Sequence, residues 1–142
     1  MILLRDSEDE AALRSTFRRI FAKYQGIESD PEEADASKVA LWQQLNDIDA
    51  LSMAAPEHSG GGEATMSQLC VVVEEAAANL GSTGLVEHLV ATRFLGQETL
   101  RIAPANAGVH AVTLALRPSR SGRWPMVPTT ASPSLVVGLH RD

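Results

Sequence analysis

Residues 51–62 are Leu-Ser-Met-Ala-Ala-Pro-Glu-His-Ser-Gly-Gly-Gly, and they form the strongest break in the helical pattern of the chain. Proline and glycine mark turns more strongly than any other residue, and here Pro56 is soon followed by three successive glycines. A phosphate-binding loop would need a preceding strand and a following Lys-Ser or Lys-Thr pair, and the stretch has neither. We therefore predict a structural connection between two helices, with direct phosphate binding as the less favoured alternative.

The 142-residue chain has the length and composition of one globular domain. Its net charge of −6 disfavours general nucleic-acid binding. The single cysteine, Cys70, indicates a reducing compartment, and its apolar surroundings predict a buried packing residue. No apolar run approaches the ~20 residues that span a bilayer. Residues 1–4 are apolar but too short for a signal peptide, so we expect a soluble, cytoplasmic protein.

The first helix is predicted to begin at a capping box formed by Ser7 and Glu10. One face of this helix is apolar and comprises Leu13, Phe17, Ile20, Phe21 and Tyr24. The other face is basic and comprises Arg14, Arg18, Arg19 and Lys23. We interpret the basic face as solvated, which is the usual state of such a charge run.

Residues 28–35 are acidic, contain Pro31 and are predicted to form an exposed loop. A second helix is expected from about Ser37, with an apolar face of Val39, Leu41, Trp42, Leu45 and Ile48. A second capping box, Thr65 to Gln68, begins a third helix that runs to about Leu80. This helix is apolar over much of its surface, which predicts a place in the middle of a bundle. Its stripe comprises Leu69, Val72, Val73, Ala76 and Leu80, widened by Met66, Cys70 and Ala77.

Two kinds of titratable residue deserve a chemical interpretation. Glu74 and Glu75 are adjacent on the third helix, where about 100° separates successive side chains. We favour surface or ion-paired carboxylates, with a buried catalytic carboxylate as the alternative. His88 has no second histidine or cysteine nearby in the sequence, so we predict a surface or capping residue and no metal site.

The second half of the chain changes from helical to strand-like patterns. A fourth helix contains Leu85, Val86, Leu89 and Val90, and a short fifth helix is predicted over residues 97–102. Residues 110–116 and 134–139 are predicted strands, separated by a loop rich in proline, serine and arginine. Two strands alone are marginally stable, so the predicted fold is mainly α, with about five helices and an incomplete β segment.

Three segments together resemble the N-terminal helical domain of the acyl-CoA dehydrogenases. They are the Leu41-Trp42-Gln43-Gln44-Leu45 helix, the turn at residues 53–61 and the helix that carries Glu74 and Glu75. The resemblance covers roughly residues 8–116. The sequence is most similar in character to actinobacterial-type members, in which a catalytically competent subunit pairs with a degenerate one. It implies a helical domain over residues 1–104 and the start of a middle β-domain over residues 105–142.

The resemblance also implies a function in lipid metabolism. Members of the family are FAD-containing oxidoreductases that remove two hydrogens across Cα–Cβ of an acyl-CoA thioester. They work as oligomers, so the expected partners are a homologous subunit and the acyl-CoA substrate. The positions that match the wall of the family's acyl channel are Leu85, Val86, Leu89 and Val90, although the same residues equally suit a bundle core.

The chain departs from the family at the positions that carry the chemistry. Family members have a Thr-Glu-Pro motif after the first middle-domain strand, whereas residues 116–122 here lack the Thr-Glu pair. The family's catalytic glutamate lies in a C-terminal bundle, and Glu74 and Glu75 do not match it. We therefore assign no catalytic residue and expect a chain that is not catalytically complete alone. The alternative is a non-catalytic helical interaction module, or a degenerate subunit that stabilises a full-length dehydrogenase.

Overall fold

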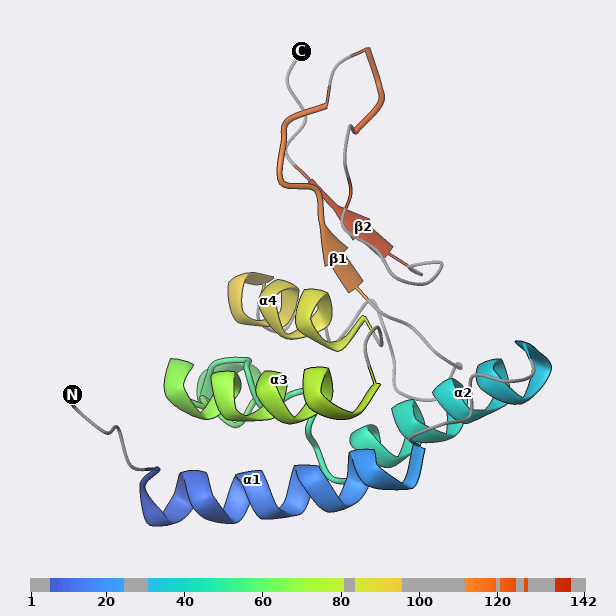
Figure 1. The fold of residues 1–142 in the computed structure, drawn as a ribbon. Helices are drawn as coiled ribbons and strands as arrows, with labels where there is room; N and C mark the ends of the chain where they lie inside the picture. The colour runs from blue at the N-terminus through green and yellow to red at the C-terminus, as the bar shows by residue number, and fades with distance from the viewer. Residues whose placement is uncertain are drawn as a thin grey trace, which may run out of the picture.

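The helices of this protein are arranged in layers, with α3 between α1 and α4 (Figure 1). The computed structural model describes residues 6–24, 31–80, 84–95, 112–119, 121–124, 127 and 135–138. Within these residues the helices are α1 (Glu8–Phe21), α2 (Pro31–Asp47), α3 (Met66–Leu80) and α4 (Leu85–Leu95). Two single 3₁₀ turns, η1 (Ala22–Tyr24) and η2 (Glu57–Ser59), and two strands, β1 (Val112–Leu114) and β2 (Leu135–Val137), complete the described elements. The mainly helical fold predicted from the sequence is confirmed.

Both predicted capping boxes are present. The Ser7 backbone amide donates to Glu10 Oε2 at 2.7 Å, and the Glu10 amide donates to Ser7 Oγ at 3.2 Å. At the start of α3, the Thr65 amide donates to Gln68 Oε1 at 2.8 Å, and the Gln68 amide donates to Thr65 Oγ1 at 3.2 Å. Each box satisfies two backbone donors that a helix N-terminus would otherwise leave without partners.

The predicted loop over residues 28–35 is wrong in its second half, because α2 already begins at Pro31. Proline is well suited to the first position of a helix, where its fixed φ is already helical and its missing N–H has no partner to lose. The sequence signal for a helix break was therefore a signal for a helix start. Farther along α2, Leu41, Trp42 and Leu45 are buried, whereas Val39, and Ile48 directly after the helix, are exposed.

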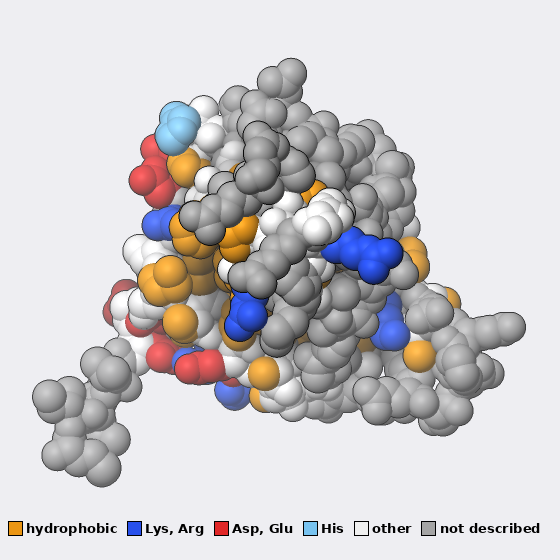
Figure 2. All heavy atoms as spheres, turned by 90° about the horizontal axis from the view of Figure 1, so that it is seen from above, with side chains coloured by type: hydrophobic (Ala, Val, Ile, Leu, Met, Phe, Trp, Pro, Cys, Tyr) orange, Lys and Arg blue, Asp and Glu red, His pale blue; other side chains and the backbone are white. Residues whose placement is uncertain are grey.

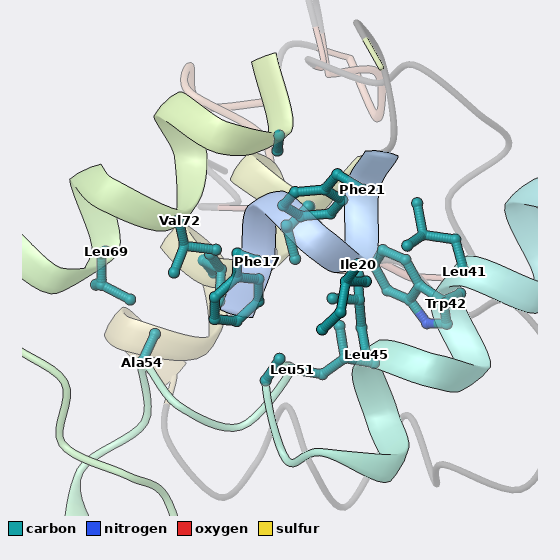
Figure 3. Packing of buried hydrophobic residues seen from close by; sticks show 14 of the residues in the cluster. Phe17, Ile20, Phe21, Leu41, Trp42, Leu45, Leu51, Ala54, Leu69 and Val72 are labelled. Atoms are coloured by element: carbon teal, nitrogen blue, oxygen red, sulfur yellow. The ribbon is translucent and has the colours of Figure 1, made fainter. Parts of the chain in front are cut away.

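One hydrophobic core joins all four helices and the connection between α2 and α3 (Figure 3). The largest completely buried side chains in it are Phe21 of α1, Leu45 of α2, Val72 of α3 and Leu85 of α4. Complete burial of a side chain of this size contributes about 1.5–3 kcal/mol to folding. The apolar face predicted for α1 is confirmed, since Phe17, Ile20 and Phe21 are buried.

The third helix has the central place that was predicted, but its apolar stripe is narrower than expected. Leu69, Val72 and Ala76 face the core, whereas Met66 and Cys70 are exposed. The prediction that Cys70 is a buried packing residue is wrong. Cys70 follows Leu69 directly, and the rotation of about 100° between them turns its thiol away from the core.

The glycine-rich stretch is a hydrogen-bonded connection from α2 to α3. Gly60 adopts a left-handed conformation with φ of 74°, and its amide donates to the Glu57 carbonyl at 2.8 Å. The amide of Gly61 donates to the carbonyl of Pro56, and that of Gly62 to the carbonyl of Ser52. All three glycine amides are thus used inside the turn, and none is left to bind a phosphate.

The two strands pair in parallel, with Val112 opposite Leu135 and Leu114 opposite Val137. They lie next to α4, on the side away from α3 (Figure 1). Both strands fall inside the predicted ranges and are shorter. The predicted fifth helix, residues 97–102, lies outside the described residues. Within the described parts of the chain, no helix combines the length and hydrophobicity needed to cross a membrane.

Candidate functional site

The candidate site is the outer face of α4. The four residues that the sequence assigned to an acyl-chain wall divide between two faces of this helix. Leu85 and Leu89 are buried in the core. Val86 and Val90 retain 45% and 41% of their surface and form an exposed row, which Phe94 continues at 77%. The three positions are four residues apart and therefore lie on one side of a helix. We call Val86, Val90 and Phe94 the outer row.

The outer row is an exposed set of apolar side chains on α4. In the view from above, hydrophobic side chains lie exposed next to lysine or arginine side chains (Figure 2). Single exposed apolar residues are common in proteins, whereas three of them on successive turns of one helix are a candidate binding surface. The buried pair beneath, Leu85 and Leu89, fixes α4 in the core and so holds the outer row in place.

His88 lies on the inner side of α4, and the prediction that it is a surface or capping residue is wrong. The side chain is buried, and its ring meets the indole of Trp42 edge-on with 5.2 Å between centroids. Nε2 lies 3.2 Å from the Leu51 carbonyl oxygen, and the Val112 amide donates to Nδ1 at 3.4 Å. His88 therefore touches α2, the residue that begins the glycine-rich stretch, and β1.

Both ring nitrogens of His88 are engaged, and the ring is neutral at pH 7. Burial lowers the pKa of His88 to about 4, and the hydrogen bond to the Leu51 carbonyl opposes this only in part. A nitrogen that is already hydrogen-bonded to backbone has no free lone pair for a metal ion. Among the residues that the structure describes, no group of three or more His, Cys, Asp or Glu side chains could hold a metal.

Arg93, one turn farther along α4, holds the other end of the connection between α2 and α3. Its Nη1 donates to the carbonyl oxygens of Ala64 at 3.1 Å and Ala54 at 3.4 Å. Together with the contact between His88 and Leu51, these bonds fix the connection between α2 and α3 to α4 at three carbonyls. The sequence carried no signal for this role, because the partners lie 29 to 39 residues away from Arg93.

A second polar cluster joins α1 to α3 through Glu75. Arg18 binds its carboxylate in a bidentate manner, at 3.0 and 2.8 Å, and Arg14 donates to Oε1 at 3.1 Å. The Glu75 side chain is only 5% exposed, whereas that of Glu74 is 63% exposed and pairs with Arg14 at 3.0 Å. The favoured interpretation of the two glutamates as surface or ion-paired is confirmed. The expectation of a solvated basic face is wrong for Arg14, which is only 26% exposed, whereas Arg18 is 63% exposed and also pairs with Glu75.

The electrostatics of this cluster do not suit a general base. The hydrogen bond from Arg18 is the largest influence on the pKa of Glu75, and with Arg14 it outweighs burial and lowers that pKa. A carboxylate that is held ionised by two arginines is a weak proton acceptor. Glu75 therefore links α1 to α3 and has no free position for a substrate.

Three of the described buried polar side chains already have partners within the chain. Glu75 is bound by arginines, and His88 is bound by backbone groups. The hydroxyl of Thr92 donates to the His88 carbonyl at 2.7 Å. These three side chains are thus committed to contacts within the chain, and we assign none of them to a flavin.

The chain is similar to a known protein family over most of its length. The family model described as "Acyl-CoA dehydrogenase, N-terminal domain" matches residues 7–103. The matched segment includes α1 to α4, the glycine-rich stretch and the outer row. No curated protein and no solved structure gives a match.

Proposed function

The chain belongs to the acyl-CoA dehydrogenase family, and we propose that it supplies the N-terminal helical part of a flavoprotein subunit of that type. The reaction would be α,β-dehydrogenation of an acyl-CoA thioester. In this proposal residues 1–104 are the helical domain and residues 105–142 begin a middle β-domain. The chain is not catalytically complete alone, and it acts with a homologous subunit in a homo- or hetero-oligomer. We place it in the cytoplasm.

The observation that carries the proposal is the outer row of α4. Eight residues separate Val86 from Phe94, so the row extends about 12 Å along the helix axis. An acyl chain lying along it would bury apolar surface on both partners. Val86 and Val90 would make the direct contacts, and the buried pair Leu85 and Leu89 would support them from the core.

FAD enters the proposal through family membership. When bound, it would accept the hydride that leaves the β-carbon of the acyl group. Glu75, His88 and Thr92 are not assigned to the flavin, because each is already engaged within the chain. No residue of this chain is therefore assigned to FAD, and no reaction step is derived through it.

Acyl-CoA binding by paired variants tests the proposal. Octanoyl-CoA would be titrated into the chain, alone and with a full-length acyl-CoA dehydrogenase subunit, and the heat of binding measured. Replacing Val86 and Val90 by serine removes about 1 kcal/mol of apolar contact at each site, and should weaken binding at least tenfold. Val39→Ser is the matched control, because Val39 is an exposed helical valine on α2, 37% exposed.

Two outcomes would contradict this function. The first is that octanoyl-CoA binds neither the chain alone nor the mixture with the full-length subunit. The second is that Val39→Ser weakens binding as much as the double substitution in the outer row. Flavin retention and acyl-CoA-dependent bleaching, measured on the same samples, test the cofactor separately. Bleaching by the chain alone would refute the statement that it is catalytically incomplete.

A second function rests on the same surface. Phe94 is the most exposed residue of the outer row, and a large exposed aromatic side chain is typical of protein interfaces. The chain would then be a non-catalytic interaction module, or a degenerate subunit that stabilises a full-length dehydrogenase. Co-purification with such a subunit that is lost in Phe94→Ser, without any acyl-CoA binding, would favour this alternative.

A further inference from the structure

The side chain of His88 connects the helical layers to the first strand. Its backbone belongs to α4, yet one ring nitrogen faces Leu51 at the end of the α2 region and the other faces Val112 at the start of β1. We propose that His88 is a positioning residue, a hydrogen-bonded joint that fixes where β1 begins relative to α4. The inference goes beyond the proposed function and does not require that the outer row bind an acyl chain.

The two contacts determine which nitrogen carries the proton. The Val112 amide is a donor, so Nδ1 must accept and must be unprotonated. The Leu51 carbonyl is an acceptor, so Nε2 must carry the hydrogen. The neutral Nε2–H tautomer satisfies both contacts, whereas the Nδ1–H tautomer and the charged ring would each set a donor against the Val112 amide. The joint thus requires one protonation state out of three.

The surroundings of the ring maintain that state. Trp42 packs edge-on against the imidazole from α2, and the ring is removed from water. The other contacts of the ring are a backbone carbonyl and a backbone amide, neither of which titrates. In such a site, loss of one hydrogen bond leaves a buried backbone group without a partner, which is costly.

The joint lies directly behind the outer row. His88 is two residues from Val86 and two from Val90, and it faces inward where they face solvent. The helix α4 therefore carries the outer row on one side and, through His88 on the other side, holds the start of β1. Loss of the bond to His88 would leave the Val112 amide without this partner, while Leu85 and Leu89 stay in the core.

Two half-substitutions separate the two bonds. In His88→Asn the amide oxygen occupies the place of Nδ1 and can still accept from Val112. In His88→Gln the amide nitrogen reaches the place of Nε2 and can still donate to the Leu51 carbonyl. Amide exchange at Val112, followed by NMR on the full chain, should be at least tenfold faster in His88→Gln than in the wild type. In His88→Asn it should stay within about threefold of the wild type, less than 1 kcal/mol in opening free energy.

Thr92→Val is the control, because it removes a buried hydroxyl that bonds the His88 carbonyl and leaves the ring untouched. It should not accelerate Val112 selectively. If amide exchange at Val112 is accelerated equally in the Asn and Gln variants, or in neither, the proposed role of His88 is wrong. If the variants do not fold, long-range ¹H–¹⁵N spectra of wild-type His88 decide the matter. An Nε2–H tautomer at pH 7 supports the proposal, and an Nδ1–H tautomer or a charged ring overturns it.

Discussion

Replacing Gly61 by alanine places a methyl group where the structure has no room for one. A Cβ on Gly61 would lie 2.5 Å from the carbonyl carbon of Ala55 and would overlap the carbonyl oxygen and the Cβ of the same residue. Ala55 is completely buried and cannot move outward. Its amide donates to the Ser52 carbonyl at 2.9 Å, and its carbonyl accepts from the Glu63 amide at 2.9 Å. The methyl group therefore conflicts with backbone that is held on both sides.

The cost follows from these contacts. Overpacking of a close-packed site costs about 1–3 kcal/mol. If Ala55 yields, its two hydrogen bonds weaken, at about 1 kcal/mol each. We expect Gly61→Ala to lower the free energy of unfolding by about 3 kcal/mol, a large part of the 5–15 kcal/mol typical of a domain. The melting temperature should fall by about 10 °C.

The matched control is the same change at the preceding residue. Gly60 has φ of 74°, and a Cβ there would meet nothing within 4 Å. Gly60→Ala should thus cost only the strain of a left-handed alanine, about 1 kcal/mol. Both variants would be measured by urea denaturation monitored by circular dichroism. If Gly61→Ala is no less stable than Gly60→Ala, the packing of the glycine-rich stretch described here is wrong.

Three further predictions test the polar residues. Glu75→Gln should lower the free energy of unfolding by about 2 kcal/mol in urea denaturation, because it removes a buried charge from the arginine pair. Glu74→Gln should change it by less than about 0.5 kcal/mol, since exposed ion pairs contribute little. The pKa of His88 is about 4 in the folded chain and about 6.5 in an unfolded one, so unfolding takes up a proton between these values. The contribution of neutral His88 to the free energy of unfolding should be fully present above pH 6.5 and fall by about 3 kcal/mol as pH drops to about 4. In His88→Gln the free energy of unfolding should depend less on pH over this range. Cys70 is exposed, so a thiol reagent should label the native chain completely without denaturant, and protection of Cys70 would contradict its outward position.

The parts of the fold that the sequence predicted well depend on local chemistry. A capping box needs two residues three positions apart, and those at Ser7 and Thr65 are visible in the sequence and present in the structure. The apolar face of α1 follows from helical periodicity alone and does not depend on its partner. The glycine-rich stretch was predicted as a connection because the strands and lysine of a phosphate loop were missing.

The errors concern residues whose environment is set by distant parts of the chain. His88 has partners 37 and 24 residues away, at Leu51 and Val112, and a single sequence contains no signal for either contact. Cys70 was misplaced because an almost wholly apolar helix does not reveal which of its sides is inward. Pro31 was misjudged for another reason, since proline both breaks helices and begins them.

The candidate site shows the same division. Helical spacing made Leu85, Val86, Leu89 and Val90 a group, but only the structure separates the buried pair from the exposed pair. The separation decides which residues a ligand can touch. It also explains why α4 needs two kinds of contact, apolar ones that fix its depth in the core and polar ones that fix its rotation.

The direction in which the outer row points depends on the rotation of α4 about its own axis. Apolar contacts fix the depth of a helix through close packing, but a single dispersion contact has no preferred direction. Hydrogen bonds are directional, and α4 makes them through His88 and through Arg93. Both residues bind the stretch between α2 and α3, so the glycine-rich connection and the outer row are aligned by the same bonds. A change at Gly61 that displaces the connection should therefore reach α4 through Arg93, which bonds Ala54 and Ala64 on its two sides.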